Sequence, residues 1–138
     1  MMKRTTMTLD PRNRLRDIPG FRRLSEDTLE LIASMSTELS VDKGYLLTRQ
    51  GAPGQEAFVI VEGTAAFWRT GEPVSILTAG ALVGELALLD GIPRTGNVVA
   101  VTPLRVLVLN PTEFSSLCDD AAFGEWARHQ ADDHKRDE

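Results

Sequence analysis

The spacing of hydrophobic positions changes along the 138-residue chain, from a helical period to short β-type runs and back to a helical period. Near the N-terminus, Leu29, Ile32 and Ala33 recur at helical spacing, which places them on one helix face. Ser25 precedes them and suits an N-cap, because two acidic residues follow it in the first turn. The pattern predicts a helix over 26–36.

Between residues 37 and 109 the chain consists of short runs rich in β-branched and aromatic residues, separated by glycines. Such runs with turn residues between them are typical of an all-β barrel or sandwich. Turns are expected at 42–44, 62–63 and 70–73, where Gly, Asp and Pro gather. The predicted strands are 45–48, 58–61, 64–68, 74–77, 97–101 and 104–109.

After the strands the helical period returns. Asn110-Pro111 suits a cap and the first residue of a helix over 111–118. A second helix is expected over about 120–132, because Phe123, Trp126 and Ala127 share one apolar face. The predicted fold is therefore mainly β with flanking helices, a jelly-roll-like β-roll between N-terminal and C-terminal helices.

Charge divides the chain unevenly. Residues 1–23 hold seven Lys or Arg and two Asp, a net +5, whereas residues 24–138 hold eight Lys or Arg and eighteen Asp or Glu, a net −10. The acidic body argues against nucleic-acid binding by the domain. We divide the chain into a partly disordered basic arm (1–20, with a short helix from Pro11), a domain (21–132) and a charged tail (133–138) that frays. The arm contacts an acidic partner, or it is a solvated lead-in, or it pairs with the acidic body of its own chain.

Composition removes several classes of function. No stretch approaches the ~20 apolar residues of a membrane span, and no signal-peptide run follows Met1, so a cytoplasmic protein is expected. A single cysteine, Cys118, excludes an intrachain disulfide and a thiolate-rich metal site. The two histidines, His129 and His134, leave little for a metal centre or for histidine-dependent catalysis. We expect no metal and no enzymatic activity.

One segment, residues 80–96, departs from the strand–turn pattern. It contains Glu85-Leu86-Ala87-Leu88-Leu89, a set of good helix formers, directly after Gly84. A single helical turn entered through a glycine offers unpaired N–H groups to an anion, and Arg94 can add two donors to a phosphate. Glu85 beside such a site suits a ribose hydroxyl, as acidic residues do in dinucleotide folds. The combination indicates a sugar phosphate or nucleotide.

The same residues carry a resemblance. Gly84-Glu85-Leu86-Ala87-Leu88, followed by Pro93-Arg94-Thr95, resembles the phosphate-binding cassette of the cyclic nucleotide-binding domain family. That family includes CRP/FNR-type bacterial regulators, regulatory subunits of protein kinase A and cyclic-nucleotide-gated channels. The resemblance extends from about Phe21 to Phe114.

The resemblance implies a site residue by residue. Gly84 and Glu85 would contact the ribose, with Glu85 accepting from the 2′-hydroxyl. Leu86 and Ala87 would offer backbone N–H groups to the cyclic phosphate, and Arg94 would pair with its equatorial oxygen. Thr95 lies at the position where family members have Ser, Thr or Ala. In such members a hydroxyl at this position contacts the phosphate or, in several cGMP-selective members, the guanine. The implied ligand is cAMP or cGMP, of which we favour cAMP.

Three further positions bear on this implied site. Gly96-Asn97 departs from the family, which usually has Ala and then Ser or Thr, and Gly96 keeps its N–H accessible while loosening the backbone. Trp126 either caps the base by stacking or packs in the core.

The leading hypothesis is a non-enzymatic sensor without an effector domain of its own. Ligand binding would move the last helix, and the signal would pass to a partner protein or across a homodimer. The alternative is a ligand-free interaction or scaffolding module. A cupin-type enzyme is a third possibility, against which the lack of histidines among the strands counts.

Overall fold

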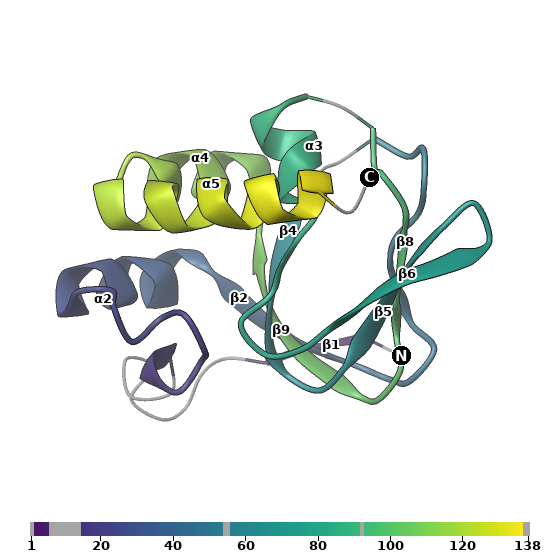
Figure 1. Ribbon diagram of the computed structural model, residues 1–138. Helices are drawn as coiled ribbons and strands as arrows, with labels where there is room; N and C mark the ends of the chain where they lie inside the picture. The colour runs from purple at the N-terminus through teal and green to yellow at the C-terminus, as the bar shows by residue number, and fades with distance from the viewer. Residues whose placement is uncertain (1, 6–14, 54–55, 92, 137–138) are drawn as a thin grey trace.

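The computed structural model describes residues 2–5, 15–53, 56–91 and 93–136, and in it two antiparallel sheets curl into a roll with helices gathered along one side (Figure 1). The order of strands is β1-β2-β9-β4-β7 in the five-stranded sheet and β3-β8-β5-β6 in the four-stranded sheet. The strands are β1 (Met2–Thr5), β2 (Thr37–Val41), β3 (Leu46–Thr48), β4 (Ala57–Glu62), β5 (Ala65–Arg69), β6 (Glu72–Leu77), β7 (Leu82–Val83), β8 (Asn97–Ala100) and β9 (Leu104–Leu109). The helices are α2 (Glu26–Met35), α3 (Glu85–Leu89), α4 (Pro111–Cys118) and α5 (Ala121–Arg136).

The five-stranded sheet is buried on both faces at its centre. On β9, Leu107 and Leu109 belong to a core beneath the helices, whereas Val106 and Val108 belong to a second core inside the roll. Strand β4 divides its side chains in the same way. Burial on both faces explains why these strands are continuous hydrophobic runs in the sequence and why they were easy to predict.

Three strands differ from the predictions. Residues 2–5 form β1 and pair with β2, although residues 1–10 were expected to be disordered; residues 6–10 lie outside the described part. Strand β2 was missed because Thr37–Val41 carries polar residues, and its pairing with β1 and β9 decides its state. Strand β7 was missed because it has two residues, which pair with β4.

Caps set the helix boundaries, as predicted. Ser25 accepts from the Thr28 N–H at the start of α2. Asn110 and Glu113 form a capping box at the start of α4, with Pro at its first position. Helix α5 continues to Arg136, beyond the expected end near residue 132, since no Gly or Pro interrupts its C-terminal half.

The described residues of the basic arm join the domain. Leu15 and Ile18 are buried in the core beneath the helices. Arg16 forms an ion pair with Glu26 at the start of α2. At Arg16 the arm therefore pairs with its own acidic body, one of the interpretations that the charge pattern left open. The remainder of the predicted helix from Pro11 lies outside the described residues.

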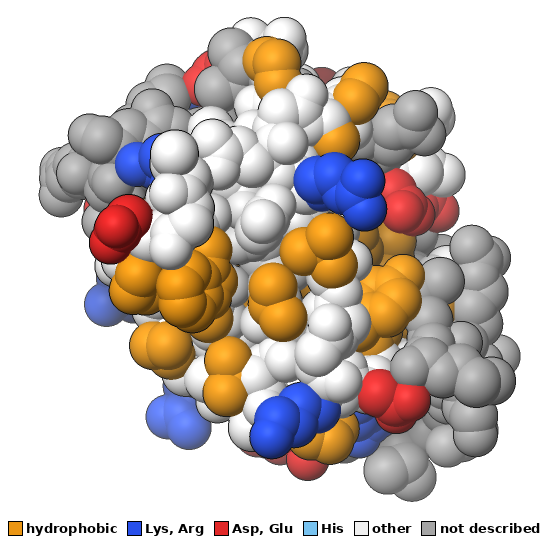
Figure 2. All heavy atoms as spheres, turned by 90° about the vertical axis from the view of Figure 1, so that its right-hand side faces the viewer, with side chains coloured by type: hydrophobic (Ala, Val, Ile, Leu, Met, Phe, Trp, Pro, Cys, Tyr) orange, Lys and Arg blue, Asp and Glu red, His pale blue; other side chains and the backbone are white. Residues whose placement is uncertain are grey.

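The outer face of the four-stranded sheet carries a band of hydrophobic side chains, bordered by charged ones (Figure 2). Among the described residues, the large exposed hydrophobic side chains are Trp68 on β5, Ile76 on β6 and Val101 after β8. Strand alternation turns Phe67, the neighbour of Trp68, toward the inside of the roll, where the candidate site lies.

Candidate functional site

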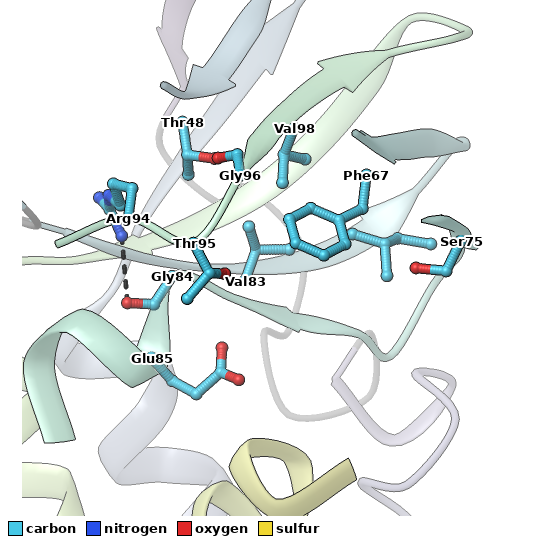
Figure 3. A pocket seen from close by; sticks show the side chains of 11 residues that line it. Thr48, Phe67, Ser75, Val83, Gly84, Glu85, Arg94, Thr95, Gly96 and Val98 are labelled. Carbon is cyan, nitrogen blue, oxygen red and sulfur yellow. Dashed lines mark hydrogen bonds between the residues drawn. The ribbon is translucent and has the colours of Figure 1, made fainter. Parts of the chain in front are cut away.

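A hollow inside the roll brings together most of the residues expected to bind a ligand (Figure 3). Its empty volume is about 500 Å³, including the part open to solvent. One side carries Gly84, Glu85, Arg94 and Thr95. The rest of the wall is mostly apolar. The hollow is therefore amphipathic, with charged groups at one side.

Gly84 forms the junction between β7 and α3, and the helical turn predicted at 85–89 is confirmed. Its φ of +84° lies in the left-handed region that favours glycine. A Cβ at this position would overlap Nη1 of Arg94 and lie 3.0 Å from the carbonyl oxygen of Glu56. Glycine is thus required both for the backbone conformation and for the approach of Arg94.

The Arg94 guanidinium lies at the rim of the hollow, against Gly84. Its Nη1 donates to the Gly84 carbonyl at 3.0 Å (Figure 3). Its Nη2 donates to the Glu56 carbonyl at 2.7 Å. Burial lowers the pKa of Arg94 from its ordinary value, while the carboxylates of Glu56 and Glu85 oppose that shift. Arginine nevertheless stays charged in proteins, so a partly desolvated cation faces the site.

Glu85 is the first residue of α3 and is only 1 % exposed. Its side chain lines the hollow with Thr95 and Arg94. Figure 3 shows its carboxylate on the same side of the hollow as Thr95, apart from the guanidinium of Arg94. Burying a carboxylate is costly unless polar or charged partners compensate, and the Arg94 guanidinium is one charged group that interacts with Glu85.

The apolar wall consists of Phe67, Leu77, Val83 and Val98. Ser75, on β6, adds one polar atom: its Oγ is buried and has no hydrogen-bond partner among the described residues. Strand alternation alone did not reveal the role of Ser75 or Leu77, because the segment 72–77 also faces solvent in part. Ser75 lies opposite Phe67, and Leu77 lies opposite Ala65, in the β5–β6 pair, so Ser75 and Leu77 share one face of the sheet with Phe67. This pairing could have identified both residues.

Gly96 is closely surrounded, and its expected loosening of the backbone stays a prediction. A Cβ there would overlap the Phe67 ring and the Trp68 carbonyl oxygen. Gly96 is buried, and Thr48 donates to its carbonyl at 2.9 Å. Where the family usually has alanine, this chain has Gly96, and the Phe67 ring occupies the space that the methyl group of an alanine would fill.

Arg69 supports this wall from behind. Its guanidinium carbon lies 5.2 Å from the centre of the Phe67 ring, and its Nε donates to the Thr95 carbonyl at 3.3 Å. Such a cation–π contact stabilises the ring's position. No local pattern indicated Arg69, since its bond to Thr95 joins β5 to a residue 26 positions away.

Trp126 does not line the hollow, so the structure does not bring it to a base-capping position. The centre of its ring lies 5.0 Å from that of Phe21 and 5.5 Å from that of Phe123. Trp126 therefore packs against the core beneath the helices, which was the alternative to base capping. Leu86 and Ala87 lie in α3, and their expected main-chain contact with a phosphate stays a prediction.

Comparison with known proteins identifies the class to which this fold and site belong. Residues 38–121 match the family model of the cyclic nucleotide-binding domain, and the chain belongs to this family. The cassette resemblance and the β-roll prediction are both confirmed.

The chain resembles particular members as follows. It is 35% identical over 104 residues to a cyclic nucleotide-gated potassium channel of Mesorhizobium japonicum, covering 75% of this chain and 29% of the channel. The regulatory domain of Toxoplasma gondii protein kinase A, solved with cAMP, superposes with a TM-score of 0.75 at 23% identity, covering 88% of this chain and 49% of that one. The regulatory subunit of a cAMP-independent protein kinase A from Trypanosoma brucei superposes with a TM-score of 0.70 at 24% identity, covering 76% and 39%. The chain thus spans less than a third of the curated channel's length.

No described group of three or more His, Cys, Asp or Glu side chains is placed to hold a metal ion. No helix in the described part of the chain has both the length and the apolar character needed to cross a membrane.

Proposed function

We propose that this chain is a regulatory sensor module that binds a 3′,5′-cyclic nucleotide, cAMP or cGMP, in the hollow of the roll. The observation that carries the proposal is the placement of a partly buried Arg94 guanidinium and a buried Glu85 carboxylate on one side of a single apolar hollow. A cyclic nucleotide has the matching order of groups: an anion, a ribose hydroxyl and a flat base.

Arg94 is the proposed phosphate ligand. A guanidinium has five N–H donors, and the two bonds to main-chain carbonyls use one donor on each terminal nitrogen. Those carbonyl bonds hold the guanidinium in place while further N–H groups face a phosphate oxygen. Main-chain N–H groups of Leu86 and Ala87, in the first turn of α3, are the proposed additional donors.

Glu85 is the proposed ribose ligand. A carboxylate only accepts hydrogen bonds, so it selects a hydroxyl over a phosphate oxygen. A ligand that presents its anion to Arg94 and its 2′-hydroxyl to Glu85 would bind both charged groups. A 2′-deoxy cyclic nucleotide would leave the buried carboxylate without that donor and would bind more weakly.

Contacts from α5 offer a route for the signal. The Gln130 Oε1 accepts from the Leu82 N–H at 3.2 Å, and Arg128 pairs with Asp90 at 3.3 Å. These contacts join α5 to both ends of the β7–α3 segment. Tightening of that segment around a ligand would therefore move α5, and α5 would pass the change to a partner protein or to a second copy.

Isothermal titration calorimetry with cAMP, cGMP and 5′-AMP tests the binding proposal. We expect binding of at least one cyclic nucleotide, little binding of 5′-AMP, and loss of binding in Arg94→Glu. Arg22→Glu is the matched control, because Arg22 is exposed and does not line the hollow. Absence of heat with both cyclic nucleotides, confirmed by an unchanged melting temperature at millimolar ligand, would reject the sensor function.

A ligand-free interaction module is the second candidate. The observation that favours it is the structural similarity to a regulatory subunit described as belonging to a cAMP-independent kinase, which indicates the same fold in such a protein. The calorimetry separates the two functions, since a scaffold would bind neither nucleotide. Tight binding of a metal ion would instead support the hypothesis of a cupin-type enzyme.

A further inference from the structure

A short segment, residues 48–52, runs along the stretch 94–97 and holds the main chain of Arg94. The Gly51 N–H donates to the Arg94 carbonyl at 2.9 Å, and the Arg94 N–H donates to the Ala52 carbonyl at 2.9 Å. Both main-chain groups of Arg94 are therefore bound by two consecutive residues of one loop. The position of the guanidinium depends on where that loop lies.

Asn97 fixes the loop from the side of β8. Its Oδ1 accepts from the Gln50 N–H at 2.7 Å. Gln50 immediately precedes the two residues that bind Arg94, so this bond sets their distance from the start of β8. The hydrogen bond is short and joins residues 47 positions apart, which makes it a tertiary contact rather than a local turn.

The side chain of Gln50 fixes the loop from a third direction. Its Oε1 accepts from the Thr70 N–H at 2.7 Å, and its Nε2 donates to the Thr70 Oγ1 at 3.3 Å. Thr70 lies in the turn between β5 and β6 with a φ of +52°, a conformation that side chains other than glycine rarely adopt. Two hydrogen bonds from one amide group hold that turn against the loop.

We infer that Asn97 and Gln50 are positioning residues for the phosphate site, a role that rests on the proposed function. Through the loop 50–52 they hold the main chain of Arg94 at the place from which its side chain reaches the Gly84 carbonyl and the hollow. Asn97 thereby acquires a function at the position where the sequence departs from the family's usual Ser or Thr. A Ser or Thr side chain is shorter and would not reach the Gln50 N–H without movement of the backbone.

The test measures how well Arg94 discriminates between the two exocyclic oxygens of the phosphate. The probes are cAMP and the two diastereomers of its phosphorothioate, in which sulfur, a weaker acceptor, replaces one oxygen or the other. The ratio of the two affinities reports the contact of Arg94 with a particular oxygen. A variant that merely weakens the fold lowers both affinities together and leaves the ratio unchanged.

We expect Asn97→Ala to weaken cAMP binding about three- to tenfold, which is the range for one lost hydrogen bond, and to bring the diastereomer ratio closer to one. Asn97→Asp keeps an oxygen that accepts from the Gln50 N–H and should retain both the affinity and the ratio. Gln50→Ala should follow Asn97→Ala. Val99→Ala, on the same strand but outside this contact, is the matched control and should leave the ratio unchanged.

The outcomes are distinct. A diastereomer ratio in Asn97→Ala equal to that of the wild type, with cAMP still binding to both, overturns the positioning role alone. The role is likewise overturned when Asn97→Asp loses the ratio as fully as Asn97→Ala. A wild-type protein that binds none of the three probes overturns the proposed function, and the positioning role with it.

Discussion

Replacement of Gly96 by alanine should destabilise the protein by overpacking. The added Cβ would overlap the edge of the Phe67 ring, would lie 2.8 Å from its Cζ, and would overlap the Trp68 carbonyl oxygen. The carbonyl cannot retreat easily, because β5 pairs with β8 on one side and with β6 on the other. The ring is similarly restricted, because Arg69 lies over it.

The expected magnitude follows from this geometry. An extra methyl group in a site without space typically costs 1–3 kcal/mol, and two obstacles place Gly96→Ala at about 2 kcal/mol. Urea denaturation followed by circular dichroism measures the free energy of unfolding of the wild type and of the variant. A loss below about 0.5 kcal/mol would refute the packing argument, since surface substitutions commonly reach that value.

A double-mutant cycle identifies the obstacle. Removal of the ring in Phe67→Ala relieves one of the two overlaps, so the double variant should be more stable than the sum of the single effects predicts, by about 1 kcal/mol. The residual cost of Gly96→Ala in that background measures the overlap with the Trp68 carbonyl. Additive single effects would show that the Phe67 ring is not the group that excludes a side chain at Gly96.

Three other predictions concern single groups. Gly84→Ala should abolish cyclic nucleotide binding, measured by calorimetry, because it strains the backbone and displaces Arg94; retained affinity would contradict this. Ser75→Ala should change the ratio between the affinity for cAMP and the affinity for the analogue that lacks the 6-amino group, because the buried Oγ would contact the base. An unchanged ratio would contradict that contact. Burial, and next Asp119, raise the pKa of the Cys118 thiol, so iodoacetamide should alkylate the folded protein much more slowly than the unfolded protein at pH 8 and rapidly only at higher pH. Equal rates in both states at pH 8 would show a normal thiol pKa. Because the folded state favours the protonated thiol, this contribution to stability is present at neutral pH and is lost as the pH rises through the folded-state pKa.

The type of most elements could be predicted because their signals are local. The caps at Ser25 and Asn110 bond main-chain N–H groups three residues further on, and β9 is a mostly apolar run with buried residues on both faces. The cassette was found for the same reason, since Gly84, Glu85 and Arg94 lie within eleven residues of one another. Strand β2 could not be predicted in this way, because its polar residues show no strand pattern and are held in a strand by pairing with β9.

The helical pattern of Trp126 shows why burial does not identify a site. Periodicity established that its ring faces inward from α5, but two interiors adjoin the five-stranded sheet, and a one-dimensional pattern does not distinguish them. Only the packing of Trp126 against Phe21 and Phe123 assigned it to the core beneath the helices.

The amino-acid sequence by itself determined the helices, most strands, the nucleotide cassette and the identity of its charged residues, because each depends on neighbours within a few positions. Only the tertiary structure decided what holds those residues: the loop 50–52 at Arg94, the ring of Phe67 against Gly96, and Ser75 in the wall of the hollow. These contacts join residues about 20 to 50 positions apart in the chain. Their energies arise from strand pairing and close packing, which carry no periodic trace in the sequence.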